Sequence, residues 1–156
     1  MSMATQAPEI MTRTQAHVEF GDALEDLVRA VLKASGRGVP GGETELTLSQ
    51  YFVMGAMEAK ALTVSEVARA ARVAVPTATR ALRALETRGF VDRQRNDDVD
   101  RRLVTVELTP SGRAVLDEKR TWVQGRQREI FDGLAAAERD SVTGALKAIA
   151  HTIEEL

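Results

Sequence analysis

One segment of the chain carries guanidinium and hydroxyl groups at helical spacing. If residues 75–88 form a helix, its apolar side chains gather on one side at about 100° per residue, and these are Ala78, Leu82 and Leu85. The other side carries Thr79, Arg80, Arg83 and Thr87, and Thr77 lies near the helix start. Arginine can donate two hydrogen bonds to O6 and N7 of guanine, and threonine can bond bases or phosphates. This chemistry suits a helix that reads duplex DNA. Judged from this segment alone, it is equally consistent with a solvent-exposed helix face whose arginines pair with Glu86.

A second cluster of arginines surrounds the polar segment 96–102, directly behind that helix. The cluster consists of Arg93, Arg95, Arg101 and Arg102. Residues 90–95 and 103–108 are β-prone, so they predict a hairpin with the polar segment at its tip. An arginine there can enter the minor groove, which concentrates negative potential where it is narrow. We expect at least one of the acids in this segment to pair with an arginine, the acids being Asp97, Asp98 and Asp100. The arginines of the hairpin favour the interpretation that this region contacts DNA over that of a solvated helix face.

The distribution of charge along the chain fits this interpretation better than the net charge does. The whole chain has a formal charge of −2. Residues 60–102 hold ten Lys/Arg and six Asp/Glu, so this segment is +4 and the remainder of the chain is −6. A local basic surface is enough to meet phosphates, and an acidic remainder keeps the rest of the molecule away from DNA.

Other kinds of chemistry have little support in the sequence. The chain has no cysteine, which excludes disulfides, thiolate metal sites and a catalytic or redox-sensing thiol. His17 and His151 are isolated, so we expect no metal or other cofactor, with His17 the better candidate for a ligand contact. Met54, Met57 and Trp122 are candidates for lining a small-molecule pocket, although core packing is the favoured interpretation. No catalytic triad or nucleophile motif can be assembled, so we expect a protein that is not an enzyme.

The ends and connections of the chain also carry information. Residues 1–14 have no apolar stretch typical of a signal peptide and predict a flexible tail. No run of about 18 apolar residues occurs, so we expect no membrane span, and a cysteine-free chain fits the reducing cytoplasm. The Gly-rich segment 36–42 predicts a flexible connection, because no strand precedes it and no Gly-Lys-Ser/Thr follows it, as a phosphate-binding loop would require.

Helical periodicity and capping signals predict six helices and one hairpin. The expected helices span 15–35, 47–59, 63–71, 75–88, 110–132 and 137–155. The second should bury Leu48, Tyr51, Phe52, Met54 and Met57. Thr63 and Glu66 have the spacing of a capping box, Gly89 is a helix stop, and Thr109-Pro110 is a helix start. Two short helices joined by a tight turn and followed by a hairpin form the winged helix-turn-helix pattern.

The hairpin and its flanks carry a more specific pattern. It begins with Gly89-Phe90-Val91-Asp92-Arg93, continues at Asp100-Arg101-Arg102-Leu103-Val104, and ends with Val106-Glu107-Leu108-Thr109-Pro110-Ser111-Gly112. This run resembles the strand, the Asp-Arg-Arg wing and the helix start of the MarR family. Residues 46–54 resemble that family's second helix, and residues 67–89 resemble its helix-turn-helix. The resemblance extends from about residue 15 to the end of the chain.

This resemblance implies a mainly α fold with a small β-hairpin wing, in one domain over 15–156. A DNA-binding lobe would span 47–109, and the helices in 15–35 and 110–156 would form a homodimer around a two-fold axis. The two recognition helices would read a pseudo-palindromic operator in duplex DNA. Asp100 would brace the wing while Arg101 or Arg102 reaches DNA. Many members of the family release DNA when a small aromatic or phenolic compound binds, so the expected function is that of a ligand-responsive repressor.

The chain departs from the family pattern at two points. Ala74-Val75-Pro76 supplies no hydroxyl at the start of the recognition helix, so the first amides need another partner, such as a phosphate. The absence of cysteine excludes the branch that senses peroxide with a thiol. A winged helix that binds protein in place of DNA is the second hypothesis, and the basic helix face and hairpin argue against it. An enzyme is the third, and it would need a convergent polar site.

Overall fold

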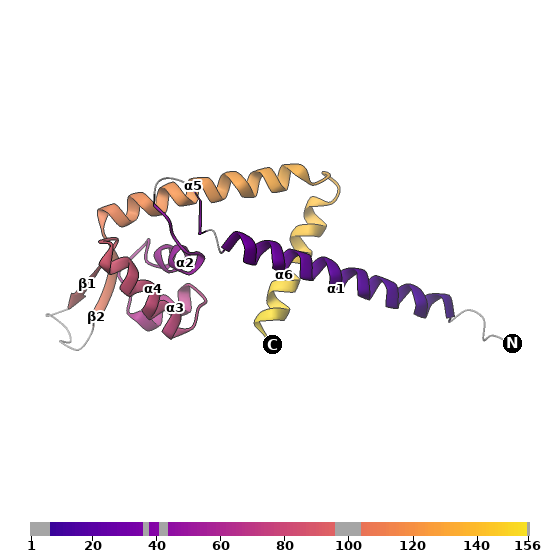
Figure 1. Ribbon diagram of the computed structural model, residues 1–156, viewed down its shortest axis with the longest axis horizontal. Helices are drawn as coiled ribbons and strands as arrows, with labels where there is room; N and C mark the ends of the chain where they lie inside the picture. Colours follow the sequence, from indigo (N-terminus) through magenta and orange to yellow (C-terminus); the bar gives the residue numbers. More distant parts are fainter. Residues whose placement is uncertain (1–6, 36–37, 41–43, 96–103, 156) are drawn as a thin grey trace.

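The computed structural model describes residues 7–35, 38–40, 44–95 and 104–155 (Figure 1). The elements are α1 (Ala7–Ser35), α2 (Leu48–Ala56), α3 (Val64–Ala70), α4 (Val75–Thr87), β1 (Val91–Arg95), β2 (Val104–Leu108), α5 (Pro110–Gly133) and α6 (Arg139–Glu154). This order confirms the predicted fold class, which is mainly helical with one antiparallel hairpin. Among the described residues, no helix is both long and apolar enough to cross a membrane.

A compact lobe forms around α2, α3, α4, the hairpin and the first turns of α5 (Figure 1). Its core contains Leu46, Val53, Met54, Met57, Val67, Ala78, Leu82, Leu85, Val91, Val106 and Leu116. Strands β1 and β2 pair antiparallel, with Val91 opposite Leu108. Leu62 adds a third strand segment, since its N–H and C=O both bond to Val106, at 3.0 and 2.8 Å. This pairing, which was not predicted from the sequence, fastens the loop before α3 to the hairpin.

Capping side chains define where the short helices of the lobe begin. The predicted box at α3 is present: Thr63 Oγ1 accepts from the Glu66 N–H at 3.3 Å, and Glu66 Oε2 accepts from the Thr63 N–H at 2.8 Å. A second box that was not predicted joins Thr47 and Gln50 at the start of α2. These reciprocal bonds satisfy amides that have no partner inside a helix. Gly89 ends α4 with a φ of 74°, as expected of a helix stop.

The junction between the hairpin and α5 is unusually close. The Thr109 N–H donates to the Phe90 carbonyl at 3.0 Å, and Thr109 Oγ1 donates to the Gly89 carbonyl at 2.7 Å. Gly112 lies directly over the same segment, and a Cβ added there would come within 2.0 Å of the Phe90 carbonyl oxygen. Only glycine fits at this position. The end of α4, the base of the hairpin and the start of α5 are therefore fixed to one another.

The structure corrects the sequence analysis at the N-terminal side of the lobe. Helix α1 begins at Ala7, so residues 7–14 belong to a helix and not to the predicted flexible tail. The proline at position 8 is compatible with this, because a first-turn residue needs no N–H partner within the helix. The Gly-rich connection is also anchored: the Val39 N–H donates to the Leu46 carbonyl at 2.6 Å, and both side chains are buried.

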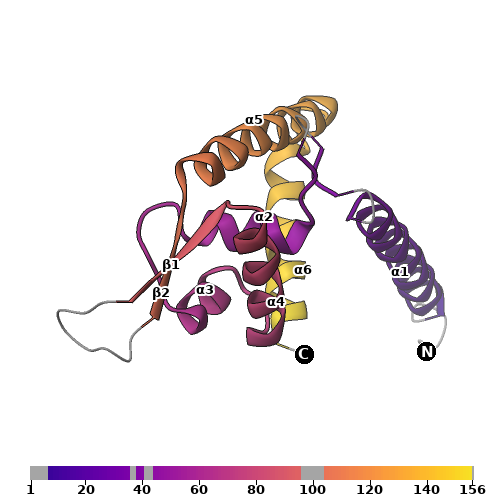
Figure 2. The same cartoon turned by 60° about the vertical axis from the view of Figure 1, so that its left-hand side comes forward.

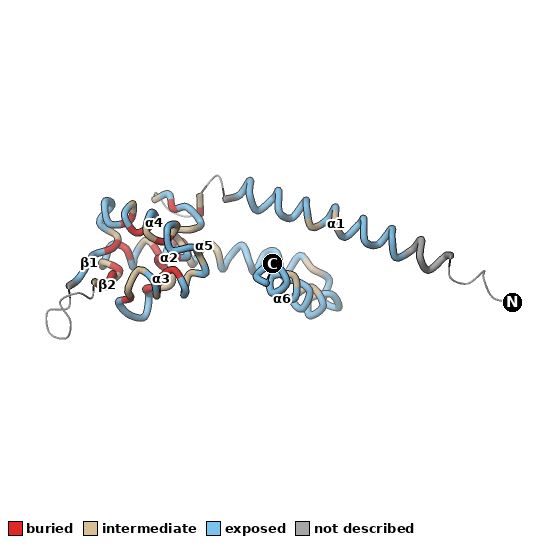
Figure 3. Tube along the Cα trace, turned by 90° about the horizontal axis from the view of Figure 1, so that it is seen from below, coloured by how far each residue is buried: buried red, intermediate tan, exposed pale blue. Residues whose placement is uncertain are grey.

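The two terminal helices, α1 and α6, lie outside the core of the lobe, and the C-terminal end of α6 reaches the lobe at Arg72. Figure 3 shows α1 and α6 almost wholly as exposed or intermediate surface, whereas the buried residues gather around α2, α3 and α4. Among described side chains, all buried residues lie between Val39 and Lys119. Long helix α5 connects the lobe to α6, and Arg139 closes the corner by lying 4.7 Å over the Phe131 ring.

Candidate nucleic-acid interface

Helix α4 is held in the lobe by one face and leaves the opposite face free. Ala78, Ala81, Leu82 and Leu85 are buried, as the spacing predicted for three of them. Arg80, Arg83 and Thr87 are exposed on the other side, while Thr77 and Thr79 are half-buried. The core contacts therefore fix the axis and rotation of α4. They also bring together on its outer face the two arginines and Thr87 that the sequence analysis selected.

The hydroxyl groups on this face are partly used by the helix itself. Thr79 Oγ1 donates to the Val75 carbonyl and Thr87 Oγ1 donates to the Arg83 carbonyl, each at 2.9 Å. A hydroxyl engaged in this way keeps an acceptor lone pair, and the side chain also keeps its methyl group. The strong hydrogen-bond donors of the outer face are thus the guanidinium groups.

Ion pairing leaves those guanidinium groups available. Glu86, the partner considered for them in the sequence analysis, bonds instead to Arg93, with Nε and Oε2 3.0 Å apart. Within the part of the chain that the structure describes, no ion pair involves Arg80 or Arg83. The Glu86–Arg93 pair also ties the base of the hairpin to α4.

The residues predicted for the wing are placed only in part. Arg95 is the last residue of β1 and pairs with Val104, and Figure 2 shows both strands at the edge of the lobe beside α3. The side chain of Arg95, together with Asp100, Arg101 and Arg102, lies outside the described residues. Their assigned roles stay predictions.

The start of α4 lacks a side-chain cap, as predicted. Ala74 is the N-cap residue and makes no side-chain hydrogen bond to the helix. Beside it, a shallow depression of about 400 Å³ is lined by Val75, Pro76, Thr79, Arg80 and Arg83. This depression opens on the same outer face as the arginines.

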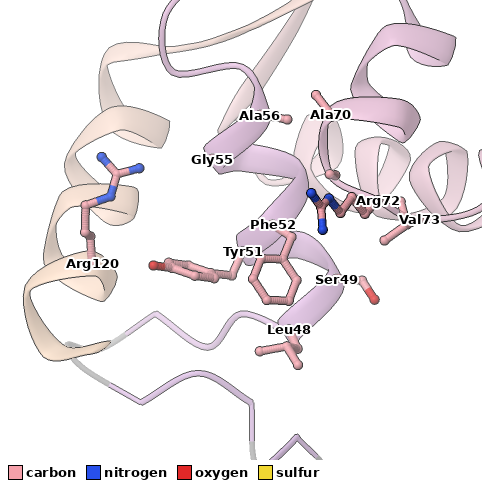
Figure 4. A pocket seen from close by; sticks show the side chains of 11 residues that line it. Leu48, Ser49, Tyr51, Phe52, Gly55, Ala56, Ala70, Arg72, Val73 and Arg120 are labelled. Atoms are coloured by element: carbon pink, nitrogen blue, oxygen red, sulfur yellow. The ribbon is translucent and has the colours of Figure 1, made fainter. Parts of the chain in front are cut away.

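A separate cavity of about 690 Å³ lies between α2, the end of α3 and α5. Its wall includes Tyr51 and Phe52, and two guanidinium groups flank it, those of Arg72 and Arg120 (Figure 4). Figure 4 shows Tyr51 directed from α2 toward Arg120 on α5. Neither arginine was predicted from the sequence. The prediction that Phe52 and Leu48 are buried is wrong, because they are 47% and 36% exposed and line the cavity.

Each cavity arginine has an acidic partner. Arg120 bonds to Glu58, which raises the pKa of Arg120 and lowers that of Glu58. Arg72 Nη1 lies 2.6 Å from Glu154 Oε1 at the end of α6. Arg72 occupies the turn between α3 and α4 with a φ of 53°, so the bridge joins that turn to the C-terminal helix. No local signal in the sequence predicts a contact over this separation.

The residues predicted to line a ligand pocket do not form one group. Trp122 lines a smaller apolar cavity of about 330 Å³ with Val31, Val39 and Leu48. Met54 and Met57 are completely buried in the core of the lobe, the alternative that the sequence analysis favoured. His17 is exposed on α1. In the described residues, no group of three or more His, Asp or Glu side chains could hold a metal ion.

Comparison with known proteins gives a consistent result. A model of the MarR family matches residues 44–112, which contain the lobe and the start of α5. The chain is 26% identical over 141 residues to the HTH-type transcriptional regulator TcaR of Staphylococcus aureus, covering 90% of this chain and 93% of that protein. Among solved structures, it resembles BpsR of Bordetella bronchiseptica, whose DNA binding is regulated by 6-hydroxynicotinic acid. The TM-score is 0.67 at 26% identity, covering 85% of this chain and 98% of BpsR.

A third similarity concerns the fold. FabT of Streptococcus pneumoniae, solved in complex with DNA, superposes with a TM-score of 0.67 at 22% identity, over 91% of this chain and 98% of that one. The matched family, the regulator relatives and the winged-helix lobe with its free basic face agree with one another. Residues 44–112 therefore form a MarR-family region, and over most of its length the chain resembles DNA-binding transcriptional regulators of that family.

Proposed function

We propose that this protein is a homodimeric repressor that holds a pseudo-palindromic operator and releases it when a small aromatic anion binds. The observation that carries the DNA-reading part is the outer face of α4, where Arg80 and Arg83 are exposed and have no acidic partner among the described residues. Free guanidinium groups on a rigid helix suit bidentate contacts to guanine. Arg95, Arg101 and Arg102 add contacts from the wing to the minor groove and the phosphates.

The apolar surface of the terminal helices supports a dimer. On α1 the exposed apolar side chains include Val18, Phe20, Leu27, Val28 and Leu32. On α5 and α6 they include Ile130, Phe131, Leu146 and Ile153. Monomeric proteins rarely leave large apolar patches in water, so these exposed side chains indicate an interface. A second copy that packs its own α1, α5 and α6 on this surface buries it and forms a two-fold interface.

Two-fold symmetry determines how the dimer reads DNA. The two copies of α4 enter successive major grooves on one face of the duplex, at a spacing of about 34–36 Å. The half-sites are then inverted copies of one another, which makes the operator a pseudo-palindrome. With about six to ten phosphate contacts per dimer, affinity should fall steeply as salt rises.

The cavity between α2 and α5 supports a response to a small molecule. Tyr51 and Phe52 offer aromatic surface, and Arg72 and Arg120 offer charge, which together suit an aromatic carboxylate or phenolate. Such an anion competes with Glu154 for Arg72, in the turn that precedes the recognition helix. It releases DNA only if it binds the DNA-incompetent arrangement more tightly. The regulation of BpsR by 6-hydroxynicotinic acid is consistent with this class of ligand.

DNA titration with arginine variants tests the reading face. After an operator is selected from random duplexes, affinity is measured for the operator and for random DNA. We expect Arg83→Ala to weaken operator binding about tenfold or more and random DNA much less, and Arg95→Ala to weaken both. Arg29→Ala, a matched loss of one charge on α1, should change neither. Unchanged affinity in both Arg83→Ala and Arg95→Ala rejects the assigned roles.

Displacement from the operator tests the ligand site. Hydroxybenzoates and 6-hydroxynicotinic acid are titrated into the complex of the operator with the wild-type protein, Arg72→Ala or Arg120→Ala. We expect at least one compound to release wild-type protein, and each variant to need about tenfold more of it, since a charge-assisted hydrogen bond is lost. Equal release from all three proteins overturns the site, and no release by any compound overturns this ligand class.

A further inference from the structure

The first residue of the recognition helix is an exposed valine. Val75 is 48% exposed, and the exposed residues further along the outer face of α4 are Arg80, Arg83 and Thr87. Pro76 follows it and is also exposed. An exposed valine stabilises neither the core nor the helix, because β-branched residues are only moderate helix formers. Its position suits contact with an apolar group on whatever α4 meets.

Thr79 extends this apolar patch by one helical turn. Its hydroxyl donates to the Val75 carbonyl, so its methyl group is the remaining bulk of the side chain. Val75, Pro76 and Thr79 together line the depression of about 400 Å³, and Arg80 and Arg83 complete its wall. The apolar depression is thus bordered by the guanidinium groups of Arg80 and Arg83, which have no acidic partner among the described residues.

The major groove offers one apolar feature of matching size. Thymine carries a 5-methyl group there, whereas guanine presents the O6 and N7 acceptors that arginine prefers. We propose that Val75, Pro76 and Thr79 bind the 5-methyl group of one thymine in each half-site, next to a guanine held by Arg80 or Arg83. This specificity rests on the proposed role of α4 as the recognition helix.

Removing the methyl group from DNA tests the proposal without changing base pairing. In the selected operator, each thymine is replaced in turn by deoxyuridine, symmetrically in both half-sites, and affinity is measured. For the wild-type protein, one position should lose about fourfold per half-site, the effect of returning one methyl-sized group to water. Val75→Ala should bind the thymine operator more weakly by a similar factor and should no longer distinguish thymine from deoxyuridine at that position.

The controls separate this proposal from the one on which it rests. Val75 is half exposed, so Val75→Ala should leave thermal unfolding unchanged within experimental error. Equal wild-type affinity for thymine and deoxyuridine at every position overturns the methyl contact. So does a Val75→Ala protein that keeps the full preference, because the preference then comes from DNA shape. If Arg83→Ala still weakens operator binding in either case, α4 remains the recognition helix and only the methyl contact fails.

Discussion

The lobe and the terminal helices of this protein bury their apolar residues to very different extents. In the lobe, Val53, Met54, Val67, Ala78 and Leu82 are 2% exposed or less. In α1 and α6, no described side chain is buried, and Val18, Phe20, Leu146 and Ile153 are all more than half exposed (Figure 3). Both regions nevertheless have apolar residues at helical spacing. The same sequence pattern therefore indicates an intramolecular core in one region and an unsatisfied surface in the other.

The lobe is structurally self-contained, whereas the terminal helices are not. The lobe satisfies its own hydrogen bonds and packing, so it can present α4 in a fixed orientation. The terminal helices carry exposed apolar side chains that no other described part of the chain covers. We infer that the lobe carries recognition and that α1, α5 and α6 carry assembly. The following four variants test this division, in order of expected effect.

Charges placed on the apolar face of α1 should have the largest effect. The double substitution Leu27→Glu and Val28→Glu puts two carboxylates where both side chains are about half exposed. We expect the dimer dissociation constant to rise by a factor on the order of a thousand, because each charge would have to be buried in the interface. Sedimentation measures this. Glu25→Gln on the polar face of α1 is the control, and a fully dimeric double variant contradicts the assignment.

Within the lobe, the most damaging small change should be Gly112→Ala. The added Cβ would come within 2.0 Å of the Phe90 carbonyl oxygen, so the hairpin and α5 must separate. We expect about 3 kcal/mol of destabilisation in chemical unfolding, at the upper end of overpacking effects. Gly125→Ala, in the same helix with nothing within 4 Å, should be neutral or stabilising. Equal effects of the two substitutions would show that the junction tolerates movement.

Loss of a helix cap should have a smaller effect on stability, confined to the helix that it begins. Thr63→Ala removes the side-chain oxygen that accepts from the Glu66 N–H, so we expect a loss of about 1 kcal/mol in unfolding free energy. Thr143→Ala removes a threonine from the middle of α6, where the hydroxyl only bonds the Arg139 carbonyl, and it should change stability by less than about 0.5 kcal/mol. Unfolding is compared at one protein concentration, because dimer stability depends on it. If Thr143→Ala lowers the unfolding free energy more than Thr63→Ala does, the expected role of the cap is contradicted.

The smallest effect concerns pH and the contact between α2 and α5. The hydrogen bond from Arg120 holds the pKa of Glu58 below its ordinary value of 4.5. A carboxylate with a lowered folded-state pKa stabilises the fold above the unfolded-state pKa, and this contribution is lost as pH falls through the folded-state pKa. Glu58→Gln should therefore be slightly less stable than wild type at pH 7, with the difference disappearing in acid. Unfolding curves at several pH values measure this, and a constant difference contradicts the pairing.

Much of the lobe could be predicted because its signals are local. Thr63, Glu66, Gly89 and Thr109 act on residues one turn away, so their spacing alone locates helix ends. The outer face of α4 followed from the 3.6-residue period once Ala78, Leu82 and Leu85 were assigned to the core. Leu62 escaped prediction because its strand pairing depends on Val106, far along the chain.

The ligand cavity could not be predicted for a related reason. Arg72 and Arg120 look like ordinary surface residues in the sequence, and only the packing of α2, α3 and α5 brings them to one cavity. The exposure of Phe52 was missed because periodicity identifies an apolar face without saying what covers it. The same ambiguity affects α1, where the missing partner is a second chain in our account.

The mass of the protein, alone and on DNA, tests the central division most directly. Sedimentation of the free protein and of its saturated operator complex gives the number of chains in each. The account predicts twice the 17.0 kDa mass of one chain in solution and two chains on each operator duplex. A free mass of 17.0 kDa together with a single chain per duplex would contradict it, because the lobe would then read DNA without any assembly by the terminal helices.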